Sequence, residues 1–380
     1  MGKIKILMDV NSIVVPTGRK YLSGIGRTTL ELLLAFQKMK NLPIDLRLFT
    51  QRLPDSGIDQ YRLPFEHLYF PLPGSGVMKD WVNKFRVKEY FYKYDLYHLP
   101  HNYDQVSNAS KTVLTIHDAM FFSYPESFLG HDQAREMCPK LARKCRAIVT
   151  CSNSSKSDIV NYMNILPEKI TVIPWGVSHI VFHPERNPVE MHRKLEERGL
   201  FRPYFVMISC DIGRKNTIGL MNAFRIYLQD KNADHDLVLA WNNPPRDYLE
   251  EFAPEISTGR IRILHNVDDQ LLRHLYNGAT ASFFPSKYEG FGLPVLESMA
   301  CGTPVVTCDN SSLKEAGGDV AIYVEPDDVE QMAQCMKDFE SGKIDRKTLG
   351  HQSLIHAAHY NWHRTAEEYL RFYQMAYMLG

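Results

Sequence analysis

The sequence predicts an α/β protein built from two doubly wound, Rossmann-like domains. Its 380 residues leave room for two domains of ordinary size, and a hydrophobic share of 44% is typical of a globular protein. Each half opens with an apolar segment, then a glycine-containing loop, then a segment whose apolar residues recur at helical spacing. Strand, loop and helix in this order is how a doubly wound domain begins.

The first half begins with a predicted strand at 4–10 and a helix that follows Gly24 and Gly26. In this helix Leu32 and Ala35 fall on one face, which predicts a single buried side. The glycine pair lacks the third glycine of the dinucleotide-binding fingerprint, which disfavours a Rossmann oxidoreductase. A simple tight turn explains the pair equally well.

Two further predicted strands of the first half, at 95–99 and 113–116, run directly into polar residues. The residues that follow these strands are His101, Asn102, His117 and Asp118. Because ligands of open parallel sheets bind outside the carboxyl ends of strands, these side chains are candidates for a binding site. A purely structural role for them at the strand ends weighs about equally.

The sequence also suggests where the domains meet. We expect a first domain over 1–180 and a second over 201–363. Residues 181–200 are rich in prolines and charges without clear periodicity, and predict a linker with one short helix. The closing helix, 364–380, is expected to pack back on the first domain.

The second domain begins with a predicted strand at 204–209, followed by Arg214 and Lys215 just ahead of a helix. An arginine fork and a lysine point charge in this place suit phosphate oxygens. A solvated basic turn is an alternative of equal weight on the residues alone.

The stretch from 281 to 306 predicts a strand, a loop with Gly290 and Gly292, a short helix, and another buried strand. Pro294 suits the helix start and Gly302 its left-handed end. A helix start offers unpaired N–H groups and the positive end of the dipole, and the glycines allow close approach. The loop is therefore suited to an anion such as phosphate.

Two carboxylates flank this loop, Glu289 before the helix and Glu297 in about its first turn. Since an anion needs no carboxylate, the role that both suit is acceptance of hydrogen bonds from sugar hydroxyls. Taken one at a time, these features are also explained by a charge at a helix end beside a tight turn.

The whole string, with GFGLP and ACGTPVV around the two glutamates, resembles the glutamate–seven residues–glutamate signature of the retaining glycosyltransferases of family 4 (GT4). The resemblance extends over nearly the whole chain. It implies the GT-B fold, two Rossmann-like domains facing across a cleft, with the nucleotide-sugar donor on the second domain and the acceptor on the first. It also implies that no metal or other cofactor is required.

The resemblance assigns roles to residues of this chain. Glu289 matches the glutamate that contacts the transferred sugar, Glu297 the one that holds the ribose, and Lys215 the lysine of the diphosphate. The expected catalytic residues are His117, Glu289 and Lys215. The expected donor-binding residues are Gly24, Gly26, Arg214, Lys215, Val267, Glu289, Gly290, Phe291, Gly292, Leu293 and Glu297. His101, Asn102 and Asp118 are acceptor-side candidates.

This sequence departs from the family pattern in two places. Ser23 replaces the first glycine of the loop that resembles the family's GGIG type. Cys210 stands about where many GT4 enzymes have an arginine, so either Arg214 compensates or the diphosphate is held with one cation fewer.

The resulting expectation is a retaining hexosyltransferase of polysaccharide biosynthesis, such as that of lipopolysaccharide. The string SKYEGFGLP most resembles the corresponding segment of enzymes that use GDP-mannose. Mannose transfer to a saccharide or lipid-linked glycan is therefore the first hypothesis. The alternatives are a hexosyltransferase that uses a UDP-sugar, a sugar-nucleotide epimerase, and a non-catalytic protein that binds sugar nucleotides.

Composition excludes several other classes. Lys+Arg 44 balance Asp+Glu 44, so charge does not indicate a nucleic-acid partner. The 7 Cys include no CxxC pair, which argues against a zinc site or a disulfide framework. Asp234 and Asp236 form an Asp-x-Asp that precedes a strand, and we expect it to face solvent rather than to hold a metal. No signal peptide or membrane span is evident, and a cytoplasmic protein is expected.

One segment, 78–93, mixes basic residues with large aromatic ones. Such a helix either lies on an anionic membrane surface or packs its aromatic side chains into the first domain and leaves its lysines in water. The first interpretation predicts peripheral contact with the inner face of the plasma membrane.

Overall fold

The computed structural model describes residues 2–14, 22–51, 57–70, 89–127, 130–208 and 213–380, which form two compact units. The first unit comprises Met1–Gly176 together with Trp362–Gly380, and the second comprises Val177–Asn361. Residues 181–200, expected as a linker, lie within the second unit, where α6 (Pro188–Glu196) packs against α10 (Asp269–Gly278).

The first unit is built on a seven-stranded sheet in the order β3-β2-β1-β4-β5-β6-β7, and all the described strand pairings are parallel. Its strands are β1 (Ile4–Asp9), β2 (Ile44–Thr50), β3 (Glu66–Tyr69), β4 (Leu96–Leu99), β5 (Thr112–Thr115), β6 (Ala147–Thr150) and β7 (Ile170–Val172). Its helices are α1 (Gly24–Lys38), α3 (Met120–Ser123), α4 (His131–Lys144), α5 (Asn153–Met163) and α15 (Trp362–Met378).

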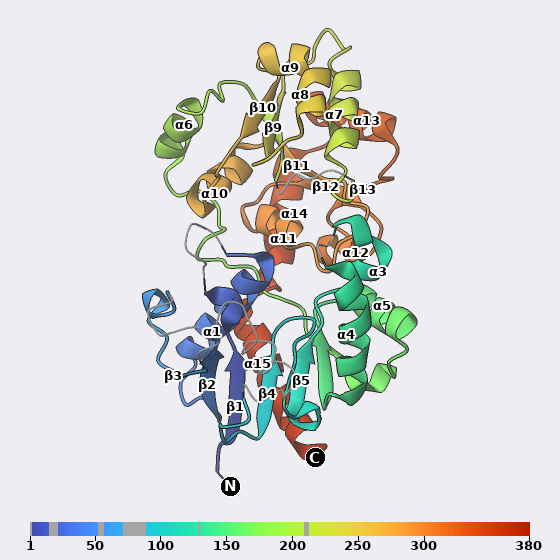
Figure 1. The fold of residues 1–380 in the computed structure, drawn as a ribbon. Helices are drawn as coiled ribbons and strands as arrows, with labels where there is room; N and C mark the ends of the chain where they lie inside the picture. Colours follow the sequence, from blue (N-terminus) through green and yellow to red (C-terminus); the bar gives the residue numbers. More distant parts are fainter. Residues whose placement is uncertain (1, 15–21, 52–56, 71–88, 128–129, 209–212) are drawn as a thin grey trace. The chain divides into compact units, whose positions relative to one another are not determined.

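Both faces of this sheet are covered by helices, as the alternation along β1 requires. Ile6 and Met8 belong to a core shared with α1 and the C-terminal helix α15, whereas Leu7 belongs to a core shared with α4 and α5. Successive residues of a strand point to opposite faces, so β1, which is apolar from Ile6 to Met8, needs partners on both sides. The order of elements and the covered faces confirm the predicted doubly wound α/β architecture (Figure 1).

The second unit repeats this plan with a six-stranded sheet, β10-β9-β8-β11-β12-β13, again with parallel pairings. Its strands are β8 (Tyr204–Met207), β9 (Asp236–Ala240), β10 (Ile261–Leu264), β11 (Ala281–Phe284), β12 (Val305–Cys308) and β13 (Ile322–Val324). Besides α6 and α10, its helices are α7 (Thr217–Tyr227), α8 (Arg246–Glu251), α9 (Ala253–Ser257), α11 (Leu293–Ala300), α12 (Leu313–Gly317), α13 (Val329–Glu340) and α14 (Arg346–Ala358).

Each sheet has one point where the strand order reverses. In the first unit it lies between β1 and β4, and in the second between β8 and β11. At such a point the two connections leave in opposite directions and open a crevice at the carboxyl ends of the strands, where ligands of this architecture bind.

The predicted strand–loop–helix–strand at 281–306 is observed. Pro294 lies in the first turn of α11, and Gly302 follows the helix with φ +76°, the left-handed conformation that ends a helix. The basic-aromatic segment 78–93 lies outside the described residues up to position 88. Its described end forms a turn at Glu89 to Phe91, followed by irregular backbone up to β4.

Within the described residues, none of the helices combines the length and the apolar composition that a membrane crossing requires.

A buried histidine ties α15 to the sheet of the first unit. His98 of β4 is fully buried, with Nε2 at 2.8 Å from Thr115 Oγ1 and Nδ1 at 2.7 Å from Tyr373 Oη of α15. Burial lowers the pKa of His98 to about 3, and the nearby His117 and His101 contribute in the same direction. The imidazole is therefore neutral at neutral pH, and each ring nitrogen has a hydroxyl partner.

This histidine predicts an acid-sensitive first unit. Its pKa is about 3 in the folded chain, against 6.5 for a histidine exposed to water, so the unfolded state binds the extra proton as the pH falls below 6.5. The resulting stability is present above pH 6.5 and is lost on acidification, by about 1.5 kcal/mol between pH 6.5 and pH 5.

Urea unfolding of wild type and His98→Gln at both pH values measures this loss. The glutamine keeps hydrogen-bonding capacity but does not titrate, so the variant should lose less stability on acidification than wild type. Equal losses in both proteins would show that His98 titrates normally when folded.

Candidate active site

The second unit brings three of the predicted site residues into one ion-pair cluster. Glu289 Oε1 lies 2.6 Å from Lys215 Nζ and 2.9 Å from Arg214 Nη1. All three side chains are largely buried, with 10% to 13% of each exposed. Arg214 also donates from Nη1 to the carbonyl of Tyr288 at 2.7 Å, and Lys215 Nζ lies 4.6 Å from the centre of the Phe284 ring.

The sheet topology explains why these residues meet. Arg214 and Lys215 follow β8, and Glu289 follows β11, the two strands at the point where the order reverses. The two connections are joined directly by a hydrogen bond from Lys287 N–H to the carbonyl of Arg214, at 2.8 Å. The cluster thus lies at the carboxyl ends of the central strands, where this architecture binds ligands.

Two serines fix the backbone at Glu289. Ser311 Oγ accepts a hydrogen bond from Glu289 N–H at 2.9 Å, and Ser312 Oγ donates to the Glu289 carbonyl at 2.8 Å. Ser311 has φ +45°, a conformation that is uncommon for residues other than glycine. Sequence reasoning assigned no site role to these serines; only their place after β12, the strand beside β11, indicated one.

The charges of this cluster hold Glu289 ionised. Burial alone would raise the pKa of this carboxyl, but the nearby Lys215 and Arg214 outweigh burial, and the pKa is lowered. A cluster of two cations and one carboxylate carries a net positive charge in a largely buried place. Such a site attracts an anion with more than one negative charge, and a diphosphate fits that description.

The loop between Glu289 and α11 supplies a second anion-binding feature. Gly292 caps α11 with φ +98°, and a Cβ at this position would lie 3.1 Å from Ala316 Cβ and 3.3 Å from Leu313 Cδ2. Glycine is therefore required both by conformation and by packing. Pro294 has no N–H, and the N–H groups of Val295 and Leu296 donate to the Gly292 carbonyl at 3.0 Å and 3.4 Å. The first turn of α11 therefore offers an anion at most the N–H of Leu293.

Glu297 lies deeper in α11 than expected. It is the fifth residue of the helix, not part of its first turn, and is buried with 7% exposure. Val267 lies in the loop that leads from β10 to α10, half-buried and separated from β8 by β9. It is therefore farther along the sheet from the ion-pair cluster than the other donor-side candidates.

In the first unit, His117 and Asn102 come together. Asn102 Oδ1 accepts a hydrogen bond from His117 N–H at 3.0 Å, and the His117 ring lies against Trp175, with centroids 5.1 Å apart. The ring Nε2 is 2.9 Å from the carbonyl of Pro100, so this nitrogen must carry the proton.

Burial lowers the pKa of His117 to about 4, so the imidazole is neutral near pH 7. In the tautomer that Pro100 requires, Nδ1 is an acceptor, and this buried atom has no hydrogen-bond partner among the described residues. His117 can therefore accept a hydrogen bond from a ligand hydroxyl without changing its charge.

The resemblance to a glycine loop led us to expect Gly24 and Gly26 in a loop, but the structure places them in a helix. Gly24 and Gly26 lie in the first turn of α1, which Ser23 caps by accepting from Gly26 N–H at 3.1 Å. A Cβ at Gly26 would lie 2.3 Å from the carbonyl oxygen of Ser12, so glycine is needed there for close backbone packing. Gly24 is exposed at the helix start, where an anion can approach the amides.

Asp9 is a buried charge that the sequence reasoning missed. It ends β1 and accepts hydrogen bonds from the backbone and side chain of Asn11, at 2.9 Å to 3.0 Å, and from Tyr97 Oη at 3.0 Å. Burial raises the pKa of this carboxyl, against the charge of the nearby His101. An aspartate at the end of an apolar strand, followed by an asparagine, was the available signal.

The remaining acceptor-side candidates have separate positions. His101 is half-buried after β4, and its buried Nδ1 has no hydrogen-bond partner among the described residues. Asp118 Oδ1 accepts from the N–H of Met120 at 3.0 Å, at the start of the short helix α3. Cys210, at the place of the family's arginine, lies outside the described residues.

The Asp-x-Asp motif meets the expectation at one of its two positions: Asp234 is exposed to solvent, whereas Asp236 is buried. Asp236 begins β9 and is only 3% exposed, with Oδ1 at 3.1 Å from Arg260 Nε, while Arg202 and Arg262 approach within 4.0 Å and 3.8 Å. It does lie at the amino end of its strand, away from the edge that binds ligands. Arginines rather than water solvate this carboxylate.

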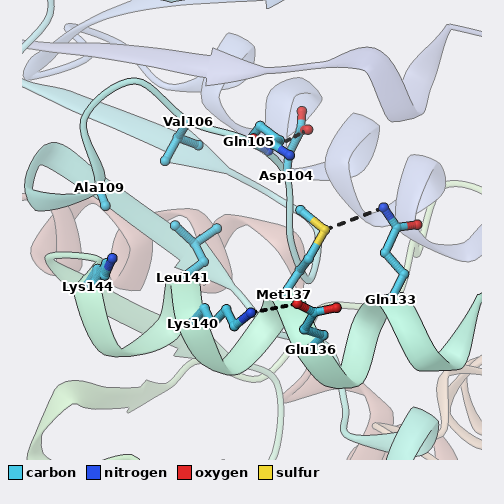
Figure 2. Close-up of a pocket in the computed structure, with 10 residues that line it drawn as sticks. All are labelled: Asp104, Gln105, Val106, Ala109, Gln133, Glu136, Met137, Lys140, Leu141 and Lys144. Carbon is cyan, nitrogen blue, oxygen red and sulfur yellow. Dashed lines mark hydrogen bonds and ion pairs between the residues drawn. The ribbon is translucent and has the colours of Figure 1, made fainter. Parts of the chain in front are cut away.

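A groove outside these clusters runs along one side of α4 in the first unit (Figure 2). Val106, Ala109 and Leu141 give it apolar surface, and charged side chains surround them, including Glu136 and Lys140 paired at 2.6 Å. It contains none of the predicted site residues.

Comparisons with known proteins agree with this arrangement. Two family models match the chain, one described as Glycosyltransferase Family 4 over residues 22–179 and one described as Glycosyl transferases group 1 over residues 191–354. Among curated proteins, an O-antigen chain mannosyltransferase B of Escherichia coli is 29% identical over 294 residues, 76% of this chain and 75% of that protein. The O-antigen chain mannosyltransferase RfbU of Salmonella typhimurium is 27% identical over 60% of each chain.

Solved structures are similar over nearly the full length. A glycosyltransferase of Rickettsia africae has a TM-score of 0.72 and 17% identity, covering 99% of both chains. Anabaena Alr3699/HepE, in complex with UDP and glucose, has a TM-score of 0.73 and 17% identity, covering 98% of this chain and 100% of its own. At these identities the likeness concerns the fold, which is that of glycosyltransferases.

The ion-pair cluster predicts that substitutions of its lysine and of its glutamate have different effects on the affinity for a nucleoside diphosphate. Lys215→Ala removes a cation and should weaken binding of a nucleoside diphosphate about tenfold or more. Glu289→Gln removes the only negative charge of the cluster, so diphosphate affinity should stay the same or rise.

Calorimetric titration with GDP and with UDP measures both effects, with the exposed Lys231→Ala as a matched control. Thermal unfolding of each variant verifies that it is folded. If Lys215→Ala binds both diphosphates as tightly as wild type, the cluster is not the phosphate site.

Proposed function

Because this chain belongs to glycosyltransferase family 4, we propose that it transfers mannose from GDP-mannose to a saccharide or lipid-linked glycan, with retention at the anomeric carbon. Transfer of a hexose from a nucleotide-sugar donor is the activity of the family. The observation that carries the assignment to particular residues is the buried cluster of Arg214, Lys215 and Glu289 beside the start of α11.

The chemistry depends on charge at the leaving group. As the bond between the anomeric carbon and the diphosphate breaks, negative charge develops on the phosphate oxygen. We propose that Lys215, Arg214 and the N–H of Leu293 at the start of α11 stabilise this charge, since fixed donors in a buried site need no reorganisation during the reaction. Arg214 would take the part of the cation that Cys210 does not supply.

Glu289 then has two roles. Its carboxylate holds both cations in position, at 2.6 Å and 2.9 Å. We assign to the same carboxylate the acceptance of hydrogen bonds from hydroxyls of the transferred sugar. Glu297, on the next turn of α11, is assigned to the ribose. His117, neutral and with Nδ1 as an acceptor, is assigned to the sugar near the reacting carbon.

Retention follows from attack on the same face. The acceptor oxygen forms a bond to the anomeric carbon as the carbon–phosphate oxygen bond breaks, and the acceptor proton passes to the departing phosphate oxygen. This route needs no protein nucleophile and balances without a further reactant. Closure of the two domains on the donor would exclude water, which would otherwise compete with the acceptor.

The choice of mannose rests on the relatives, which are named as mannosyltransferases of O-antigen chains in two species. The alternative donor is a UDP-hexose, which the Anabaena structure with UDP and glucose supports. O-antigen relatives also support a role in surface polysaccharide biosynthesis, at the cytoplasmic side with peripheral contact at the membrane. The basic-aromatic segment 78–93, first proposed for this contact, lies mostly outside the described residues.

A donor screen tests this proposal. Purified protein, GDP-mannose or a UDP-hexose, and a saccharide acceptor should give transfer product with GDP-mannose as the preferred donor. Glu289→Gln should remain folded and lose most of this transfer, by about 100-fold, whereas Glu330→Gln on the exposed face of α13 should not.

Near wild-type transfer by Glu289→Gln would contradict its assigned role, and preference for a UDP-hexose would overturn the choice of donor. Release of nucleotide without a glycosidic product would favour a different reaction on the same fold.

Activity should also survive excess EDTA. We propose that Lys215, Arg214 and the N–H of Leu293 stabilise the leaving diphosphate, so chelation should remove nothing that the reaction needs. Loss of transfer in EDTA, restored by manganese or magnesium, would show that a divalent ion supplies the missing charge.

A further inference from the structure

The groove along α4, called the α4 groove below, is a cavity of the first unit that the proposed reaction does not use. It has a volume of about 430 Å³, which is within the range of pockets that bind small molecules. One wall is α4, and the other is the segment 104–109, which lies between β4 and β5 (Figure 2).

The α4 groove is elongated. On α4 it extends from Gln133, in the first turn of the helix, to Lys144 at its last position. At 1.5 Å per residue of helix, these two positions are about 16 Å apart along the axis. A site of this shape suits a chain molecule better than a single ring.

Both walls are held in place by contacts behind them. The N–H of Ser107 donates to the carboxylate of Glu89, which is only 1% exposed. On the other side, Arg135 of α4 donates to the carbonyls of Phe121 and Phe122 at 2.7 Å and 3.1 Å. A ligand of the α4 groove therefore does not need to order its walls, which lowers the cost of binding.

The lining of the α4 groove combines apolar surface with side-chain amides. Val106 and Leu141 are buried and give it an apolar floor, and Met137 is half-buried beside them. Gln105 and Gln133 each bring one acceptor oxygen and two N–H donors. Sugar rings match such a lining, because their C–H faces are apolar and their hydroxyl groups both donate and accept hydrogen bonds.

The charges of the α4 groove cancel. It contains two carboxylates, Asp104 and Glu136, and two ammonium groups, Lys140 and Lys144. Glu136 and Lys140 form an ion pair at 2.6 Å. A nucleic acid or another polyanion would require an excess of positive charge, so the balance favours a neutral ligand.

A chain of polar contacts connects the α4 groove with the acceptor-side residues at the carboxyl edge of the sheet. Asp104 accepts from Gln51 Nε2 at 3.4 Å, and the N–H of Gln51 donates to Asn11 Oδ1 at 2.9 Å. Asn11 in turn donates to Asp9, whose carboxyl interacts electrostatically with the acceptor-side candidate His101. One end of the α4 groove is thus joined to the region where we expect the acceptor hydroxyl.

The α4 groove and these polar contacts lie on the same face of the sheet. Val106 and Leu141 belong to the core cluster that also contains Tyr97. Tyr97 Oη donates to Asp9 at 3.0 Å. Since α4 lies on the connection from the end of β5 to the start of β6, its first turn, with Gln133, is the end nearer the carboxyl edge. A chain that ends at the carboxyl edge can therefore continue into the α4 groove.

We propose that the α4 groove is a binding site for a neutral oligosaccharide, namely the sugars of the acceptor chain that precede the accepting sugar. The accepting sugar lies at the carboxyl edge, and the sugars behind it extend along α4 from Gln133 toward Lys144. The identity of the chain rests on the proposed function, whereas binding of an oligosaccharide to the α4 groove does not require transfer.

A methyl group within the α4 groove reports binding at the proposed place. Met137 lines the groove, and its isotope-labelled methyl NMR signal is assigned with Met137→Leu. This signal should shift on titration with α-linked mannopentaose and stay unchanged on titration with GDP. Mannose alone should shift it far less, because a single sugar makes few of the contacts along the groove.

Two variants test the lining. Gln105→Ala/Gln133→Ala removes both amides without a change of charge, and should weaken mannopentaose binding about tenfold. Ala109→Phe places a large ring in the groove and should abolish binding. The matched control, Gln229→Ala/Gln352→Ala, removes two exposed amides of the second unit and should bind as wild type does. Thermal unfolding of each variant verifies that it is folded.

A Met137 signal that mannopentaose does not shift, or equal binding by the amide variant and its control, would overturn the proposal. A shift of this signal with protein concentration instead of saccharide would assign the α4 groove to a second copy of the chain, and would overturn it as well.

Transfer kinetics separate this proposal from the proposed function. In wild type the KM for the acceptor should fall as the acceptor lengthens from mannobiose to mannopentaose. In the amide variant this dependence on length should be lost, while kcat and GDP affinity stay the same. Saccharide binding without any transfer would contradict the proposed function alone, and a wild-type KM that does not depend on acceptor length would contradict the α4 groove alone.

Discussion

One carboxylate organises the donor side of this protein. Glu289 holds Lys215 and Arg214 within 3 Å of a single oxygen in a largely buried place, and the two cations in turn keep Glu289 ionised. Placing three charges out of water is costly unless they compensate one another, so none of them is independent. The loop that carries Glu289 must therefore be fixed, and Ser311, Ser312 and the packing of Gly292 fix it.

Topology explains why both units concentrate their polar residues at equivalent places. In each sheet the strand order reverses once, and the polar groups follow the two strands at that point. The second unit places a positive cluster there, and the first places Asp9, Asn102 and the start of α1, with His117 following the adjacent strand. The parallel sheets thus gather the proposed chemistry of each unit at the carboxyl ends of its strands.

The features that could be predicted from the sequence depend on the conformational preferences of neighbouring residues or on a long motif of specific residues. The doubly wound fold, the helix start at Pro294 and the helix end at Gly302 follow from periodicity and from the conformations of proline and glycine. The proximity of Lys215 and Glu289, 74 residues apart, did not follow from spacing; it depends on β8 and β11 being neighbours.

The errors have the same origin. Gly24 and Gly26 suggested a loop, but both lie in α1. Position 26 requires glycine because the Ser12 carbonyl packs directly against its Cα. Asp236 was expected in solvent, but arginines from neighbouring segments bury it. Asp9 was overlooked because its partners, Asn11 and Tyr97, meet it only after β1 and β4 have paired. Contacts between segments that the sequence pattern does not relate decide all three.

The most direct test of the central claim is the contribution of the diphosphate to binding. The affinity ratio between GDP and guanosine, measured by calorimetry, isolates the phosphate contacts from those of the base and ribose. If the cluster is the diphosphate site, this ratio is large in wild type and collapses in Arg214→Ala/Lys215→Ala, while guanosine affinity changes little. An unchanged ratio in the double variant would place the diphosphate elsewhere and contradict the account.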